Sequence, residues 1–240
     1  MKLMKALLAA TAMTLAAAGA VQAKTLVYCS EGSPEGFDPA PWTAGTTFDA
    51  SSRTIYNRLI EFVPGSTETQ PGLAESWETS DDGTEITFHL RQGVKFHTTP
   101  WFTPTRDFNA DDVVFSFQRQ LDKSGPWYKY APGIAWEYFD STGMASAIKE
   151  IVKVDDHTVK FVLNRADATL LATFPMDFAS IMSKEYADQL EAAGTKEQLN
   201  TQPVGTGAFT FVDYQQDAVI RYQAFADYWG GKQPIDDLIF

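Results

Sequence analysis

Two neighbouring stretches decide the fold of this chain: GLAESWETSDDGTEITFHLRQGVKFH at residues 72–97 and FNADDVVFSFQR at residues 108–119. In the first, Ile86, Phe88 and Leu90 alternate with polar residues, which is the period of a strand with one buried face. An Asp-Asp-Gly turn separates this strand from a shorter one just before it. The first stretch therefore predicts a β-hairpin.

The second stretch predicts an amphipathic helix. Asn109 stands where a side chain caps the first turn, and Asp111 and Asp112 place carboxylates at the positive end of the helix dipole. Apolar residues then recur at helical spacing at Val113, Val114, Phe117 and Leu121. These four residues give the predicted helix one apolar face.

The alternation typical of strands and the spacing typical of helices also predict the other elements of the chain. They are a short buried strand at 26–30, a helix at 49–62, a hairpin at 151–163, a helix at 183–199 broken at Gly194, a hairpin at 209–222 and the start of a strand at 235–240.

Residues 1–23 have the pattern of a secretory signal peptide. Lys2 and Lys5 precede an uncharged, alanine-rich run, and Val21-Gln22-Ala23 ends it at a cleavage site predicted before Lys24. The uncharged run is too short to span a bilayer as a helix. An exported protein is therefore expected.

Cys29 is the chain's one cysteine, which excludes an internal disulfide and a cysteine-based zinc site. Acylation at Cys29 is disfavoured because bulky Val27 and Tyr28 stand where lipoprotein processing takes small residues. Without a lipid anchor, a soluble periplasmic protein is expected. An unpaired cysteine there is a reactive thiol, an intermolecular bridge, or half of a disulfide whose partner lies outside this stretch.

Composition and motifs argue against several classes of function. The 19 Lys and Arg residues against 31 Asp and Glu residues give a net charge of −12, which disfavours general binding of nucleic acid. None of His89, His97 and His157 has a partner at metal-ligand spacing, so no metal or cofactor is expected. His89 and His157 are expected in solvent.

Catalytic motifs are also missing from the sequence. Gly205-Thr206-Gly207 lacks the spacing of a phosphate loop and is interpreted as a tight turn, and no nucleophile elbow occurs. Paired aspartates fall in turns or at element ends, where solvation explains them: Asp81-Asp82, Asp111-Asp112, Asp155-Asp156 and Asp236-Asp237. The chain is therefore not expected to be an enzyme.

The two stretches quoted first resemble the signature of the family 5 extracellular solute-binding proteins of ABC importers. PVGTGAF at 203–209 and ADYWGGKQPIDDLIF at 226–240 match further blocks of that family in the same order. The blocks TLVYCSEGSPEGFDPA at 25–40 and NRADATLLATFPMDFASIMSKEYADQL at 164–190 resemble its periplasmic dipeptide-binding members in particular.

The resemblance implies an α/β fold of the type II periplasmic-binding-protein kind, in which two lobes close on a peptide. Full members of the family are much longer than this chain. Residues 24–55 and 195–240 would form the core of lobe I and residues 56–194 its inserted subdomain, with lobe II absent. The resemblance also implies that Cys29 pairs with a cysteine beyond Phe240.

A free dipeptide is a zwitterion, so its site needs a carboxylate, a cation, and backbone or hydroxyl partners for the central amide. The loop from Trp42 to Thr47 fits the amide-pairing role: Gly45 lets the backbone approach a ligand, the threonines offer hydroxyls, and Trp42 can wall a pocket. The candidate ligand-binding residues are Trp42, Thr43, Ala44, Gly45 and Thr46. Resemblance to the dipeptide binders singles out Thr43 and Gly45.

The alternative for this loop is a plain turn before the predicted helix. The charged anchors match no motif here and are expected in the missing lobe.

The expected function is that of a monomeric periplasmic carrier. It would capture dipeptides and deliver them to an inner-membrane ABC permease by hinge closure, with no cofactor and no chemistry. The same fold could carry oligopeptides, haem or a nickel complex, because cargo is set by pocket residues. A secreted hydrolase is the alternative from a different class, and it would need a nucleophile or metal ligands.

Overall fold

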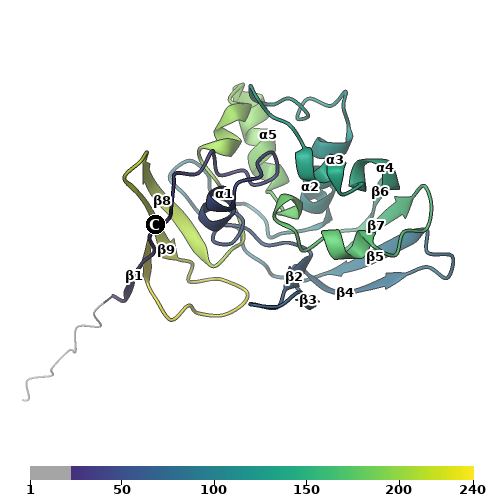
Figure 1. Cartoon of the computed structure of the whole chain (residues 1–240), viewed down its shortest axis with the longest axis horizontal. Coiled ribbons are helices and arrows are strands. Elements are labelled where there is room, and N and C mark those ends of the chain that lie inside the picture. The colour runs from purple at the N-terminus through teal and green to yellow at the C-terminus, as the bar shows by residue number, and fades with distance from the viewer. Residues whose placement is uncertain (1–22) are drawn as a thin grey trace, which may run out of the picture.

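The computed structural model describes residues 23–240, so the predicted signal peptide lies outside the described residues except for its last residue. One four-stranded sheet lies at the left of Figure 1 and a second at the lower right. The strands are β1 (Thr25–Val27), β2 (Ile60–Phe62), β3 (Thr69–Pro71), β4 (Ala74–Thr79), β5 (Glu85–Leu90), β6 (Ile148–Asp155), β7 (Thr158–Leu163), β8 (Phe209–Gln215), β9 (Val219–Ala224) and β10 (Asp237–Ile239).

The helices are mostly short. The α-helices are α1 (Gly45–Ala50), α2 (Ala110–Leu121), α3 (Glu137–Ser141), α4 (Met144–Ala147) and α5 (Lys184–Ala193). Single 3₁₀ turns cover Leu170–Thr173, Asp177–Ala179 and Lys196–Asn200. No helix within residues 23–240 combines the length and the apolar character that crossing a membrane requires.

The second sheet is built from the two hairpins that the alternating pattern predicts. Its strand order is β4-β5-β7-β6, so the hairpins join through the antiparallel β5–β7 pair, where Phe88 faces Val159. Helix α2 packs against β6 and β7. Phe117 of α2 lies 5.0 Å, between ring centroids, from Phe161 of β7. Both hairpin predictions and the α2 prediction are confirmed.

Helix α2 begins with a capping box. The Asn109 side chain accepts from the Asp111 N–H at 3.0 Å, and the Asp112 carboxylate accepts from the Asn109 N–H at 2.9 Å. The expectation that solvent explains Asp112 is wrong, because this side chain is fully buried. Its carboxylate also accepts from Arg106 at 2.7 and 2.8 Å and from the Lys184 N–H at 2.8 Å, which ties the start of α2 to α5.

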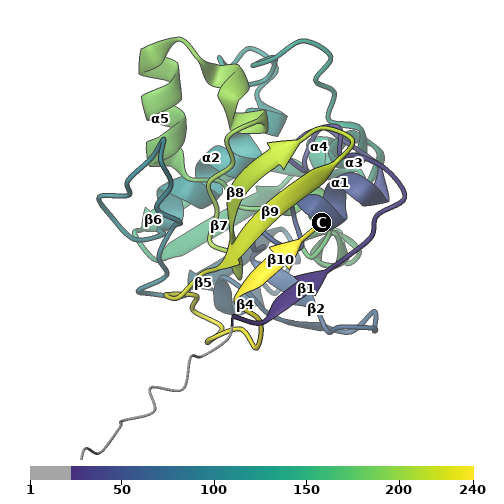
Figure 2. The same ribbon diagram turned by 90° about the vertical axis from the view of Figure 1, so that its left-hand side faces the viewer.

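The first sheet joins segments from both ends of the described chain. Figure 2 shows its strands side by side in the order β1-β10-β9-β8, with β1 parallel to β10 and Thr25 opposite Asp237. The predicted hairpin at 209–222 and the predicted last strand are confirmed. The predicted strand at 26–30 forms at 25–27, but the prediction that it is buried is wrong. Leu26 is 49% and Val27 64% exposed, because β1 is an edge strand paired on one side only.

The helix predicted at 49–62 is also wrong. Helix α1 ends at Ala50, and turns lead from it to β2. The hydroxyls of Ser51 and Thr54 bond to the carbonyls four residues earlier, at 2.5 and 2.9 Å. Such bonds compete with continuation of a helix. The apolar residues Ile55, Leu59 and Ile60 are buried from this irregular segment rather than from one helix face.

The predicted break at Gly194 is confirmed. Gly194 ends α5 in the left-handed region at φ +72°, which a residue without Cβ adopts at least cost, and a 3₁₀ turn follows.

Candidate functional site

The loop from Trp42 to Thr46 leads into helix α1. Ala44 is in the extended region, and its carbonyl accepts from the N–H groups of Thr47 and Phe48 at 3.1 and 3.2 Å, which closes the first turn. Thr43 and Gly45 are exposed, and Trp42, Ala44 and Thr46 are partly buried. We call residues 42–46 the Trp42 loop. All five candidate residues therefore sit together at the start of one helix.

Glycine at position 45 has no explanation within the described chain. A Cβ built on Gly45 would meet no atom within 4 Å, and its φ lies outside the left-handed region. Neither close packing nor backbone strain therefore requires a glycine there. Gly45 therefore presents exposed backbone without a side chain, which suits contact with another molecule.

Thr47 does not offer its hydroxyl to a ligand, contrary to expectation. The side chain is fully buried, and its Oγ1 accepts from the Glu35 N–H at 3.0 Å. This bond joins the two ends of segment 35–47. Thr47 therefore shapes the loop from inside.

A buried ion pair that no local pattern predicts holds the same segment. The Asp38 carboxylate accepts from both terminal nitrogens of Arg119 on α2, one of them at 2.8 Å, and both side chains are fully buried. It also accepts from the Tyr130 hydroxyl and from the Ala40 N–H at 3.1 Å. Burial and the Asp38 charge hold the pKa of Tyr130 well above its usual value, so its hydroxyl stays a donor.

Charge close to α1 is compensated. Arg53 is more than half exposed, and its guanidinium is paired with Asp49 and, at 3.7 Å, with Asp177. The start of α1 thus offers backbone and hydroxyl groups to a ligand, while the nearby cation already has two carboxylates.

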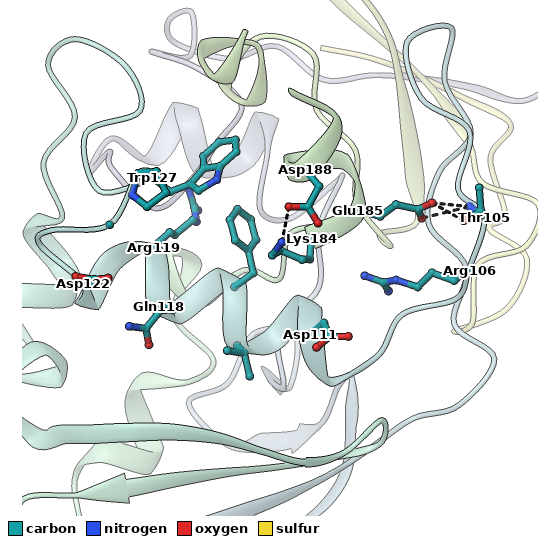
Figure 3. Close-up of a pocket in the computed structure, with 14 residues that line it drawn as sticks. Thr105, Arg106, Asp111, Gln118, Arg119, Asp122, Trp127, Lys184, Glu185 and Asp188 are labelled. Carbon is teal, nitrogen blue, oxygen red and sulfur yellow. Dashed lines mark hydrogen bonds and ion pairs between the residues drawn. The ribbon is translucent and has the colours of Figure 1, made fainter. Parts of the chain in front are cut away.

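A groove of about 600 Å³ between α2 and α5 contains none of the candidate residues (Figure 3). Its charged groups already have partners in the groove or beside it: Lys184 bonds to Asp188, Glu185 to the Thr105 N–H at 3.2 Å, and Asp111 to Lys153 at 2.9 Å. Arg106 is occupied by Asp112. Because these polar groups already have partners, we place the candidate site at the Trp42 loop and not in the groove.

The histidines do not form a metal site. Within residues 23–240 no group of three or more His, Cys, Asp and Glu residues is placed to hold a metal ion. His89 is half exposed, and His157 is partly buried in its turn. His97, in contrast, is fully buried, and its Nε2 bonds to the Gly207 carbonyl at 2.9 Å. His97 therefore has a structural role, fixing the turn at 205–207.

His97 makes stability depend on pH. Burial lowers the pKa of His97 from 6.5 to about 4. The unfolded chain then takes up this proton first as the pH falls, so stability is complete above pH 6.5 and declines between pH 6.5 and 4. We expect His97→Gln to remove up to about 3 kcal/mol of this decline, measured as the free energy of unfolding in urea at several pH values.

The control for this prediction is His89→Gln, which changes a half-exposed histidine. This variant shows how far the loss of a histidine on the surface changes the free energy of unfolding at each pH. A curve for His97→Gln parallel to that of the unmodified chain would show that His97 is not the titrating group.

Cys29 is exposed and lies beside the end of the described chain, where the tilted rings of Tyr28 and Phe240 lie 5.0 Å apart between centroids. Its pairing with a cysteine beyond Phe240 stays a prediction.

Two four-stranded sheets, helices packed on β6 and β7, and β1 running parallel to a strand more than 200 residues further on are the features of an α/β lobe of the type II periplasmic-binding-protein class. A solved dipeptide-binding protein from Pseudoalteromonas sp. SM9913, in complex with Met-Leu, superposes with a TM-score of 0.86 at 42% identity, over 90% of this chain and 42% of that one. The α/β expectation is confirmed.

The profile of the bacterial extracellular solute-binding proteins, family 5 (middle), matches residues 68–240. The chain belongs to this family. It is 58% identical to the dipeptide-binding protein of Escherichia coli K12 over 97% of its own length and 43% of the relative's. It is 55% identical to the heme-binding protein A of Haemophilus influenzae, over 90% of this chain and 39% of that relative. The chain therefore spans less than half the length of these curated relatives.

Proposed function

We propose that this chain forms lobe I of a periplasmic carrier that captures dipeptides and delivers them to an inner-membrane ABC permease. The names of the relatives support the cargo, and the family supports the role in an importer. The carrier binds and releases its ligand without chemical change. Cleavage of the signal peptide before Lys24 would place it in the periplasm as a monomer.

The division into a core and an insertion belongs to this proposal. All four strands of the β1-β10-β9-β8 sheet fall within 24–55 and 195–240, and all four strands of the β4-β5-β7-β6 sheet fall within 56–194. The buried Asp38–Arg119 pair joins the two parts. Lobe II would supply the other wall of the cleft.

The observation that carries the proposal is the exposed backbone at Gly45. A dipeptide amide buried between two lobes needs hydrogen-bond partners, and a glycine without neighbours allows close approach. The hydroxyls of Thr43 and Thr46 flank it. The Trp42 ring would add an apolar wall to this site.

We expect the mature chain, residues 24–240, to bind Met-Leu weakly, with a Kd on the order of 1 mM or above, because one lobe supplies only part of the contacts. Titration of the ¹⁵N-labelled chain should shift the amide signals of Thr43 to Thr46 in a saturable way. Gly45→Leu should abolish these shifts, because its side chain would fill the space that the ligand uses.

The matched control is Gly32→Leu. Gly32 likewise has no atom within 4 Å of a built Cβ and no left-handed φ, but it lies outside the Trp42 loop. We expect this variant to bind Met-Leu like the unmodified chain. Binding unaffected by Gly45→Leu would refute the site, and a micromolar Kd for the single lobe would refute the two-lobe account.

Haem is a second candidate cargo because heme-binding protein A is 55% identical to this chain. A Soret-band titration with haemin tests it directly. Haemin that displaces Met-Leu from the Trp42 loop at lower concentration would favour haem as the cargo.

For the hydrolase alternative, free methionine and leucine appearing during incubation with Met-Leu would contradict a carrier.

A further inference from the structure

Asn200 accepts three hydrogen bonds, one from Trp42 of the Trp42 loop and two from the segment just before that loop. Its Oδ1 accepts from the Trp42 Nε1–H at 3.3 Å and from the Asp38 N–H at 3.1 Å. Its backbone carbonyl accepts from the Phe37 N–H at 2.9 Å. Asn200, the last residue of the 3₁₀ turn Lys196–Asn200, thus holds a segment that lies far away in the sequence.

The Asn200 side chain is fixed by close packing against Gly36. A Cβ built on Gly36 would lie 2.1 Å from Asn200 Oδ1 and 2.5 Å from its Cγ. The amide plane therefore rests on bare backbone, in a space that only a glycine leaves. This contact keeps the Oδ1 directed at its two donors.

Other contacts hold the backbone around Trp42, but the Trp42 indole is held by Asn200 alone among the described residues. Asp38 is held by Arg119, and the far end of the segment is held by the bond between Glu35 and Thr47. The only hydrogen bond of the Trp42 indole within residues 23–240 is the one to Asn200. Loss of that acceptor would leave the backbone anchored and the ring free to turn.

We propose that Asn200 is a positioning residue that orients the Trp42 ring as the apolar wall of the peptide site. This inference rests on the proposed function, and it adds a residue that does not itself line the site. Asn200 acts through Trp42 and not through contact with the ligand. A tryptophan that turns freely must be ordered when the peptide binds, which weakens binding.

Asn200→Leu removes the acceptor while keeping a side chain of similar size, and Asn200→Asp keeps an acceptor oxygen. We expect Asn200→Leu to raise the Kd for Met-Leu roughly fivefold to tenfold, the effect of one hydrogen bond. Asn200→Asp should stay within about twofold of the unmodified chain. Both affinities come from the ¹⁵N titration described for Gly45.

Two further readouts separate positioning from general damage. The Trp42 indole N–H signal, assigned by its loss in Trp42→Phe, should move and exchange faster with water in Asn200→Leu and stay in place in Asn200→Asp. In the Trp42→Phe background, which lacks the indole N–H, Asn200→Leu should change the Kd by less than about twofold.

An indole signal unmoved by Asn200→Leu would overturn the inference. So would an equal loss of affinity with and without the indole N–H, since Asn200 would then act on stability alone. If Met-Leu shifts no amide signal of Thr43 to Thr46 in the unmodified chain, the proposed site at the Trp42 loop fails, and the inference fails with it as a statement about peptide. The indole signal would then still report whether Asn200 orients Trp42.

Discussion

Arg119→Met is expected to lower the free energy of unfolding by about 3–5 kcal/mol, because it leaves the Asp38 carboxylate buried without its cation. Both side chains are fully buried, so water cannot replace the lost partner. The Tyr130 hydroxyl and the Ala40 N–H would remain as donors to a charge that they cannot neutralise. Urea unfolding monitored by circular dichroism measures the change.

Two comparisons show whether the loss of stability comes from the unpaired, buried charge of Asp38. Lys184→Met breaks the partly exposed ion pair with Asp188 and should cost less than about 1 kcal/mol. The double variant Asp38→Leu with Arg119→Met removes both charges and should recover part of the stability. If the double variant is no more stable than Arg119→Met, the cost lies in packing and the charge explanation is wrong.

Elements whose signal is local could be predicted from the sequence. Strands β5 and β7 alternate between buried and less buried residues within six residues each, and Asn109 and Gly194 cap their helices with neighbouring groups. Each of these patterns forms and stabilises its element within one short segment. Tertiary packing then had only to bury a face that the pattern had already defined.

Elements set by distant neighbours could not be predicted. Strand β1 is exposed because it lies at the edge of its sheet. Ile55, Leu59 and Ile60 are apolar because the core surrounds the irregular segment that carries them, and not because they share a helix face. For the candidate site, the residue types in the Trp42 loop were enough to propose it. The residues that hold this loop in place could not be predicted, because Arg119 lies 81 residues from Asp38 and Asn200 lies 158 residues from Trp42.

The turn at 205–207 shows how such a distant neighbour constrains a residue. The segment lies directly on the backbone of residues 54 and 55: the Gly207 N–H donates to the Ile55 carbonyl at 2.7 Å, and the Phe209 N–H to the Thr54 carbonyl at 3.1 Å. A Cβ built on Gly205 would lie 2.0 Å from the Ile55 oxygen. Glycine is required there by close approach of two backbones, since φ lies outside the left-handed region.

Gly205→Ala is therefore expected to destabilise the chain by about 3 kcal/mol, which for a domain of this size lowers Tm by roughly 6–12 °C. Relief of the clash requires the backbone at Ile55 to move, and that segment joins α1 to the core. Gly32→Ala is the matched control, because its Cβ would meet nothing and Tm should change by less than about 2 °C. Calorimetric scans of both variants measure the difference. Equal Tm values would contradict this prediction, because they would mean that the two backbones can separate at little cost.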